Sequence, residues 1–592
     1  MSFGSLIARN VSAGASAGIS LRRRLGFFLL AASVGALVGL STLLLIKLVL
    51  LVQWLGYGAA SEIRFNQIIS ARPDWQVVAV PAVGGLILGM VMHFVPGRRY
   101  HGIADVMEAC AMNSARMPVR SGIGAALAAG VSLGVGAPLG REGPAVHIGA
   151  SISAFIAEKL TLDHKQSLAL LGCGAAAAVA VSFNTPIAGV IFALEVIVGY
   201  YTLRVFAPIV IATMAAMLVR DYFLGNQALF PVLPHAIVSN WEFVLFALLG
   251  VLGALLAKSL LVITGGIEQL WKGSGIPRWV QPAVAGILMG LVATQIPLVL
   301  GIGFEGTLLA LRGVFESDVL LYLLVAKLAV VCLALGSGFA GGVFGPAIFL
   351  GAMLGALFWV VVSMTGLQLS EQGVYATIGM AAMGSALLGA PISTVLIVFE
   401  LTRDYGITLG VMTAAAFAST VMQSGEHGSF FRWQLARRNV NLSRGRDISL
   451  LMTHRVESLV RDDYLLVEES ITLGELSSRM GSARQRVAVF VDDKGIFIGS
   501  ASLSMLISHA IEHGIEKQAV DSALDADYAI TSMTNIVTAV QNMAEHQHEY
   551  IPVVDRAIKK KPRLLGVVTK SDLLSEHYDV VKRAREDEFG IT

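Results

Sequence analysis

The strongest constraint on this fold is a series of long apolar segments between about Leu25 and Val421. Segments such as 27–55 and 319–336 are long enough to cross, as helices, the roughly 30 Å of hydrocarbon in a bilayer. Only 14% of the residues are charged, whereas soluble globular proteins have about 25%. The sequence therefore predicts an all-α membrane domain that crosses the bilayer several times.

Charged residues become frequent after about Ser443, which predicts a soluble domain of about 150 residues. Basic residues at 22–24 precede the first apolar segment, and Arg437 and Arg438 follow the last. By the positive-inside rule, both termini should lie in the cytoplasm. The expected location is the plasma membrane or the inner membrane. The expected divisions are an N-terminal segment 1–24, a membrane domain 25–440, a linker 441–450, two similar soluble units at 451–515 and 516–580, and a tail 581–592.

The membrane domain contains an internal repeat. Residues 133–150 (LGVGAPLGREGPAVHIGA) and 335–352 (LGSGFAGGVFGPAIFLGA) are identical at nine of eighteen positions, with an offset of 202. Residues 184–195 (NTPIAGVIFALE) and 389–400 (GAPISTVLIVFE) share a proline and a final glutamate, with an offset of 205. Two matches in the same order at nearly the same spacing indicate a duplication.

Several helices of this domain are predicted to begin inside the membrane. Pro144, Pro186, Pro346 and Pro391 each follow a glycine-rich or polar break and precede an apolar stretch, and proline is favoured in the first turn of a helix. Non-helical backbone at this depth is tolerated where it lines a cavity. Helix N-termini that converge on such a cavity bind anions through free N–H groups. The alternative is that these glycines only allow close helix packing.

These motifs resemble the CLC family of chloride channels and proton/chloride exchangers. GREGP (140–144) is similar to the gating-glutamate motif of that family, and GVFGP (342–346) to its second anion-binding loop. The resemblance implies two inverted repeats of broken helices, a homodimer, and one pathway per subunit for chloride or another small anion. It assigns the gate to Glu142 and anion contacts to His101, Gly102, Ile103, Arg141, Gly143, Val343, Phe344, Gly345 and Phe431.

Glu142 is predicted to act as a gate because it is itself an anion at a helix start. When ionised it can occupy an anion position, and when protonated it can leave. The alternative is a structural pair with Arg141, although adjacent residues on a helix do not face each other.

Two positions depart from the family pattern where side chains would contact the anion. YHGIA (100–104) replaces the usual GSGIP, so His101 stands in place of a serine and Ala104 in place of a proline. His101 either donates a ring N–H to the anion or is a satisfied histidine at a helix start, and the sequence leaves both open. Phe431 replaces the pore tyrosine and lacks its hydroxyl. Anion selectivity is therefore not predicted from these positions.

A third departure concerns protons. The exchangers commonly carry two adjacent glutamates where this chain has Glu195 and Val196. Valine cannot carry a proton, and channels of the family typically have it there. Glu195, which is repeated at Glu400, is interpreted as structural. We therefore predict passive, channel-like conduction, with proton-coupled exchange as the alternative.

The soluble domain resembles a tandem CBS module. Residues 486–506 and 549–574 both indicate strand, turn, strand and helix. The motif GVVTKSD (566–572) implies an adenine-nucleotide site at Thr569 and Asp572, whereas Met505 replaces the carboxylate in the first unit. A role in dimerisation and stability without a ligand is the alternative.

Other functions receive little support from the sequence. A divalent-cation transporter needs several convergent carboxylates, and the acids near the expected pathway are few. No nucleophile–base pair or HExxH motif suggests an enzyme. Cys110, Cys173 and Cys332 lie in apolar stretches and are interpreted as small buried residues rather than metal ligands. We expect no catalytic residue, no metal and no nucleic-acid partner.

Overall fold

The computed structural model divides into two compact units, Met1–Ser443 and Arg444–Thr592, which are described separately. The structure describes residues 3–59, 61–62, 64–94, 101–112, 115–199, 203–225, 230, 236–403, 405–425, 428–438, 440, 454–483, 485–493, 496–525, 528–546, 548–555 and 563–589. The expected linker 441–450 lies outside these residues, as do the side chains of the expected segment 1–24.

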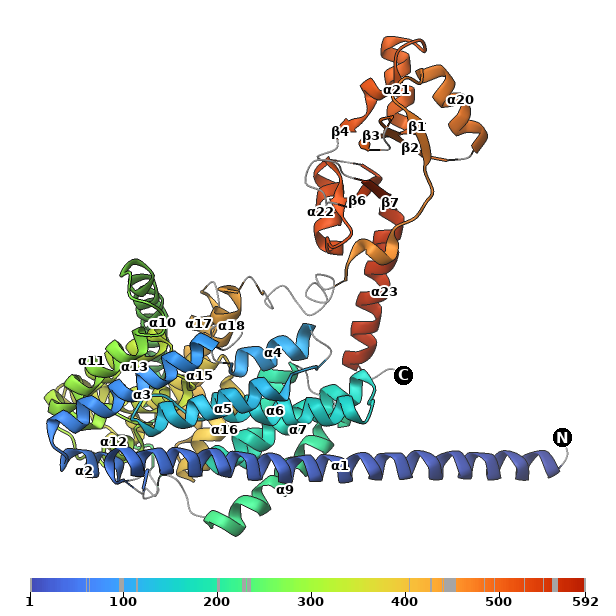
Figure 1. The fold of residues 1–592 in the computed structure, drawn as a ribbon. Helices are drawn as coiled ribbons and strands as arrows, with labels where there is room; N and C mark the ends of the chain where they lie inside the picture. Colours follow the sequence, from blue (N-terminus) through green and yellow to red (C-terminus); the bar gives the residue numbers. More distant parts are fainter. Residues whose placement is uncertain are drawn as a thin grey trace. The chain divides into compact units, whose positions relative to one another are not determined.

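The described part of the first unit is helical (Figure 1). The first half contains α1 (Phe3–Tyr57), α2 (Phe65–Ser70), α3 (Asp74–Phe94), α4 (Ile103–Met112), α5 (Val119–Gly134), α6 (Glu142–Lys159), α7 (His164–Phe183), α8 (Pro186–Phe192), a π-helix (Ala193–Val198) and α9 (Leu203–Leu224). The second contains α10 (Glu242–Gly273), α11 (Gln281–Gln295), a 3₁₀ turn (Pro297–Val299), α12 (Phe304–Leu311), α13 (Ser317–Ser337), α14 (Phe344–Ser363), α15 (Gln372–Leu388), α16 (Pro391–Thr402), α17 (Thr408–Gln423) and α18 (Phe430–Ala436).

Within the described residues, seven helices are long and apolar enough to cross a membrane. They are Leu25–Tyr57 of α1, Asp74–His93 of α3, α7, Val205–Leu224 of α9, α10, α13 and α14. Their outward-facing side chains include Leu29, Leu44 and Val262, which are 61–73% exposed. Such surfaces are stable only in lipid or against another apolar surface. This confirms an integral membrane protein that crosses the bilayer several times.

The predicted breaks are helix starts. Pro186 and Pro391 are the first residues of α8 and α16, while Pro144 and Pro346 are the third residues of α6 and α14. Proline is tolerated there because the N–H groups of a first turn have no intrahelical acceptor.

The sequence repeat is visible as a structural repeat, in which α6, α7 and α8 correspond to α14, α15 and α16. The helices α7 and α15, which precede α8 and α16, both end in the left-handed region. The residues there are Asn184 (φ 59°) and the equivalent Gly389 (φ 68°). Glycine and asparagine are the residues that adopt this conformation most readily at a helix end. The two copies thus end the same helix by the same local device.

The two halves pack in antiparallel fashion. Glu195, after α8, accepts hydrogen bonds of 2.8 and 3.2 Å from the first turn of α16. Glu400, near the end of α16, accepts bonds of 2.7 and 3.0 Å from the first turn of α8. Each helix therefore ends where the other begins, which is the relation between inverted repeats. Both glutamates cap helices, in agreement with a structural role for this pair.

The second unit contains two similar βαββα modules. The described elements of the first are β1 (Leu465–Glu468), α20 (Leu473–Ala483), β2 (Val487–Val491), β3 (Phe497–Ser502), α21 (Leu503–His513) and β4 (Leu524–Asp525). Those of the second are β5 (Ile530–Thr531), α22 (Ile536–His546), β6 (Tyr550–Asp555), β7 (Arg563–Thr569) and α23 (Lys570–Phe589). Short 3₁₀ turns lie at Val456–Leu459 and Ala519–Ser522.

The strand order is β1-β2-β3-β4 in one sheet and β5-β6-β7 in the other. In each sheet the first pair is parallel and the next antiparallel, with Val489 opposite Ser500 and Val553 opposite Gly566. A shared cluster that includes Val489, Tyr550 and Val567 joins the two modules. The structure confirms the predicted strand, turn, strand and helix, whereas α23 continues to Phe589 through most of the expected tail.

Candidate functional site

Two glycine loops meet at the centre of the first unit. Gly140 and Gly342 precede α6 and α14, and their backbones form a short antiparallel bridge with N–H···O distances of 2.8 and 2.6 Å. The bridge holds the first turns of both helices next to each other. The N–H groups of the two helix starts therefore face a common point, where a negative charge is stabilised.

The carboxylate of Glu142 occupies this point. It is 3% exposed, and its Oε1 accepts a 2.6 Å hydrogen bond from the backbone N–H of Phe344, the first residue of α14. A Cβ atom added to Gly140 or to Gly342 would lie 2.0 Å from a Glu142 carboxylate oxygen. Glycine at these two positions thus leaves a cradle that the side chain of Glu142 fills.

Only one of the two carboxylate oxygens of Glu142 accepts a hydrogen bond from the described residues. Its Oε2 is buried and has no hydrogen-bond partner in the described part of the chain. A buried acceptor without a donor costs free energy, more so when it is charged. Protonation would remove the charge and weaken the bond to α14.

The guanidinium of Arg141 does not contact Glu142. It donates to Glu62 at 2.6 Å and to the carbonyl oxygen of Ser182 at 2.6 Å, and it lies 5.7 Å from the ring centroid of Phe304. The structural pair between Arg141 and Glu142 is therefore absent.

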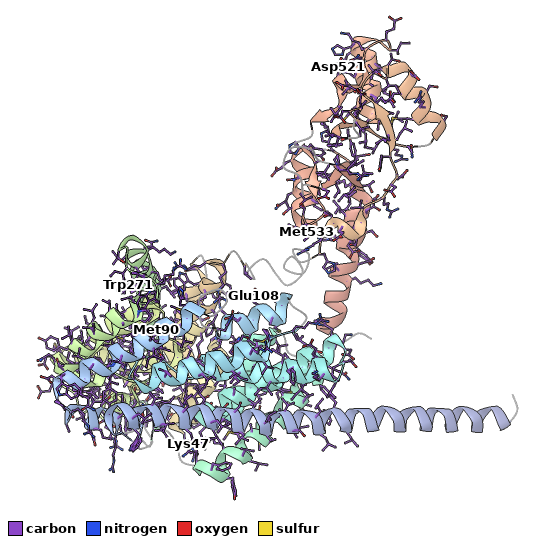
Figure 2. The ribbon with its side chains drawn as sticks, in the orientation of Figure 1. Lys47, Met90, Glu108, Trp271, Asp521 and Met533 are labelled. Atoms are coloured by element: carbon purple, nitrogen blue, oxygen red, sulfur yellow. The ribbon has the colours of Figure 1, made fainter. Side chains whose placement is uncertain are left out.

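A cavity of about 650 Å³, which we call the vestibule, reaches the same loops. Its wall includes His101, Gly102, Ile103, Gly143, Gly341, Gly342, Val343, Phe431, Trp271 and Arg438. Figure 2 labels Trp271 on α10 and Glu108 on α4. The structure thus brings the predicted residues of the α4 start, both glycine loops and α18 around one cavity. Phe344, Gly345 and the Glu142 carboxylate lie beyond its wall.

His101 is held at the start of α4. Its Nδ1 lies 3.1 Å from Oδ1 of Asp105, whose Oδ2 accepts a 2.9 Å bond from the N–H of Gly102. Arg438 also donates to Oδ1 of Asp105 at 3.0 Å. The imidazole ring stacks on His147 of α6, with centroids 5.3 Å apart and planes 19° apart.

The other two positions that depart from the family pattern, Phe431 and Val196, are buried and apolar in the structure. Phe431 is 4% exposed and borders the vestibule, where its ring contacts Phe430 at 6.0 Å between centroids. Val196 is 8% exposed and lies in the π-helix that follows α8. Neither side chain can bind or donate a proton.

Sequence reasoning missed three residues of this region. Glu62 neutralises Arg141, Asp105 fixes His101, and His147 stacks on His101. His147 could have been noticed as an ionisable residue in an apolar helix, five positions after Glu142. Glu62 had no such signal, because its partner is 79 residues away.

In the second unit, Thr569 and Asp572 lie together at the start of α23. The Thr569 hydroxyl donates to Oδ2 of Asp572 at 2.6 Å, and Arg461 forms an ion pair with Oδ1. In the first module, the equivalent Ser502 caps α21 by accepting from the N–H of Met505. A carboxylate is thus present at the start of α23 in the second module, and Met505 supplies none at the equivalent place in the first.

Comparisons with known proteins agree with this geometry. The family model described as "Voltage gated chloride channel" matches residues 83–423, and the model "CBS domain" matches residues 526–579. A ClcB-like chloride channel protein of Ralstonia nicotianae is 28% identical over 62% of this chain and 87% of its own length. Chloride channel protein CLC-e of Arabidopsis thaliana is 27% identical over 80% of this chain and 74% of its own.

Three solved structures share the fold. A slow cyanobacterial Cl⁻/H⁺ antiporter has a TM-score of 0.61 at 19% identity, covering 70% of this chain and 97% of its own. A eukaryotic CLC transporter has a TM-score of 0.60 at 18% identity, covering 93% and 98%. A CLC-type fluoride/proton antiporter has a TM-score of 0.58 at 20% identity, covering 69% and 97%. The family match spans more than half of the sequence, so this chain belongs to the voltage gated chloride channel (CLC) family, which transports chloride across membranes, and it carries a C-terminal CBS domain.

Proposed function

We propose that this protein conducts chloride passively through a pathway that the Glu142 side chain closes and opens. The observation that carries the proposal is the 2.6 Å hydrogen bond from the N–H of Phe344 to the Glu142 carboxylate. The carboxylate thus uses a helix N-terminus that could otherwise bind an anion. An ionised Glu142 and a chloride ion compete for one position.

Protonation is the step that opens this gate. A neutral carboxyl group has no net attraction to the positive end of α14, and its unpartnered Oε2 gains solvation when the side chain leaves the cradle. Anion flux should therefore increase as pH falls on the face of the membrane that supplies the proton.

The anion is proposed to pass along backbone N–H groups rather than side-chain hydroxyls. Gly102 and Ile103 stand at one end, with Gly143, Val343, Phe344 and Gly345 at the two loops, and His101 and Phe431 border the same route. The Gly102 N–H already donates to Asp105, so Ile103 is the better donor at the start of α4. For Arg141 the backbone alone is proposed, because the guanidinium is paired with Glu62.

Passive conduction is favoured over exchange by the two apolar substitutions. A proton that crosses from the vestibule to Glu142 needs groups that can carry it, and neither Val196 nor Phe431 can do so. The route therefore lacks a proton carrier at both of these positions.

Proton-coupled exchange is the second candidate, and the placement of His101 favours it. This histidine borders the vestibule and is bonded to a carboxylate, so it is an ionisable group in the position of an inner relay. Two solved proteins with the same fold are a Cl⁻/H⁺ antiporter and a fluoride/proton antiporter.

The test is anion flux from proteoliposomes as a function of pH. We expect Glu142→Gln, which imitates the protonated gate, to conduct at every pH and to lose most of the dependence on pH at the face opposite the vestibule. The exposed Glu158→Gln on α6 is the control and should behave like the original protein. An unchanged pH profile in Glu142→Gln would remove this residue from the gate.

A second measurement separates conduction from exchange. Liposomes are loaded with chloride, the membrane potential is clamped at zero, and proton uptake is followed during outward chloride movement. We expect no uphill proton uptake. Sustained uptake that disappears in Glu142→Ala would identify an exchanger, and its loss in His101→Ala would make the histidine its inner relay.

The protein is further proposed to be a homodimer with both termini in the cytoplasm. The antiparallel α8 and α16, together with α9 and α17, present the exposed side chains of Ile187, Met214, Ile392, Leu409 and Met412. A second copy of this surface is a suitable partner, since family members form dimers. Cross-linking in native membranes tests the assembly, and a reporter fused to each terminus tests the topology.

The soluble domain is proposed to bind one adenine nucleotide per chain. Asp572 would accept the ribose hydroxyl groups and Thr569 would contact a phosphate, once Arg461 releases the carboxylate. Arg461 is 65% exposed, so it can turn towards a phosphate without disturbing the core.

A further inference from the structure

Two ionisable rings lie against each other beside the vestibule and have no part in the gate proposed above. His101 borders the vestibule with a side chain that is 24% exposed, whereas His147 is 1% exposed and lies on α6, the helix that begins with Glu142. Their centroids are 5.3 Å apart and their planes 19° apart, and we call this pair the histidine stack. Ionisable residues inside a membrane domain are costly and usually functional.

Asp105 determines which nitrogen of His101 can accept a proton. Its Oδ1 lies 3.1 Å from Nδ1 of His101, and its Oδ2 accepts from the N–H of Gly102. An ionised carboxylate only accepts hydrogen bonds, so Nδ1 carries the hydrogen and Nε2 has the free electron pair in the neutral ring. A proton that arrives from the vestibule would bind at Nε2.

The surrounding charges allow one proton on the stack. The charged or titratable groups on elements packed around it include Asp105 and Glu108 of α4, Glu142, Glu158 and Lys159 of α6, Glu195 of the π-helix, Arg438 after α18, and Glu268, Lys272 and Arg278 at the vestibule. They also include Lys47 of α1, Arg120 of α5, and His164 and Lys165 of α7. Asp105 contacts His101 through its Oδ1, and Arg438 lies 3.0 Å from the same oxygen. A second proton on His147 would place two like charges 5.3 Å apart away from bulk water, which is strongly disfavoured.

We propose that the histidine stack is a single proton-binding site that opens to the vestibule and controls how readily anions enter the pathway from that side. The inference rests on the proposed anion pathway, because the stack acts on chloride that approaches the glycine loops. A positive charge on His101 attracts anions to the wall formed by Gly143 and Gly342. Flux should thus increase when pH falls in the vestibule, independently of Glu142.

The protein would then have two proton sites with separate access. Glu142 does not border the vestibule, whereas His101 does. The stack can therefore respond to the solution on one face while Glu142 responds to the other. Reciprocity requires that anions in the vestibule also raise the proton affinity of the stack.

The test uses the full-length Glu142→Gln protein, in which the gate no longer titrates. Chloride currents are recorded from excised patches, and pH is changed on one face at a time between 8 and 5.5. We expect current to rise about threefold at low pH on one face only, and to lose this response in Glu142→Gln/His101→Gln and in Glu142→Gln/His147→Gln. The control is Glu142→Gln/His164→Gln, which changes an exposed histidine at the start of α7 and should leave the pH response intact.

A third combination tests the role of the carboxylate. Glu142→Gln/Asp105→Asn should weaken the response, because His101 loses the carboxylate that holds its Nδ1. Since His101 is partly exposed, its substitution remains informative even if a change at buried His147 prevents folding.

The possible failures are distinct. A Glu142→Gln protein that passes no anion would overturn the proposed gate and this inference with it. A Glu142→Gln protein that conducts without any response to pH, or double variants that keep the full response, would overturn the histidine stack alone and leave the gate in place.

Discussion

At the scale of single residues, the proposed gate depends on two glycines without side chains as much as on the Glu142 carboxylate. The Glu142 carboxylate fits between the two glycine loops because neither Gly140 nor Gly342 carries a side chain. Phe344 contributes only its N–H. A gate of this kind needs one ionisable side chain and a backbone that leaves space for it.

This arrangement leads to a prediction for Gly140→Ala. The added methyl group would lie 2.0 Å from Glu142 Oε2 and 2.6 Å from Oε1. Its three nearest atoms all belong to the Glu142 carboxyl group. The side chain must then leave the cradle. We expect chloride flux at neutral pH within about twofold of the Glu142→Gln level, in the same liposome assay.

Gly124→Ala on α5 is the matched control, because a Cβ there meets nothing within 4 Å. It should conduct as the original protein does. If Gly140→Ala folds and keeps the original flux and pH profile, the carboxylate does not close the pathway from the cradle.

At the scale of elements, the fold is organised around helix ends inside the membrane. Glu195 caps the start of α16, and Glu400 caps the start of α8. Four backbone N–H groups of these two helices are thus hydrogen-bonded without water. Lys327 of α13, fully buried, likewise donates to the carbonyl oxygens of Val299 and Gly301 at 2.9 and 2.8 Å. Charged side chains replace the solvent that these backbone groups would otherwise need.

We predict that Glu195→Gln and Glu400→Gln each destabilise the membrane domain by about 1–3 kcal/mol, because an amide NH₂ would face backbone donors that need an acceptor. The two effects should be similar, since the two contacts are equivalent in the repeat. Thermal unfolding in detergent measures both, with exposed Glu158→Gln as the reference. Lost proton coupling with unchanged stability in Glu195→Gln would instead indicate a proton carrier.

At the scale of the whole molecule, a membrane domain and a CBS domain share one chain but have separate cores. The CBS modules are related by fold and differ at the start of their second helix. Asp572 occupies that place in one module, and Met505 in the other. The asymmetry predicts a single nucleotide site in each chain.

Calorimetry on residues 443–592 and on the full chain should show one adenine nucleotide bound per chain. Asp572→Ala removes the acceptor for the ribose and should weaken binding at least tenfold. Met505→Ala, at the equivalent place in the first module, should leave binding unchanged. Two sites of similar affinity, or binding that survives Asp572→Ala, would contradict the assignment.

The sequence alone determined the class of the protein, the duplication, the helix starts and the position of Glu142. These properties are local or periodic: apolar length, proline in a first turn, and a motif repeated 202 residues later. It also predicted strand, turn, strand and helix within 486–506 and 549–574, because alternating apolar residues and charged turns are local signals.

Which groups meet depends on how the helices pack in three dimensions. The pairing of Arg141 with Glu62, the stacking of His101 on His147, and the contact between Glu142 and Phe344 join residues 79, 46 and 202 positions apart. Nothing in the spacing of such residues encodes their distance in space. The contact between Glu142 and Phe344 is set by antiparallel packing of two similar halves, which brings equivalent helix starts together. The other two contacts depend on packing between segments of the first half.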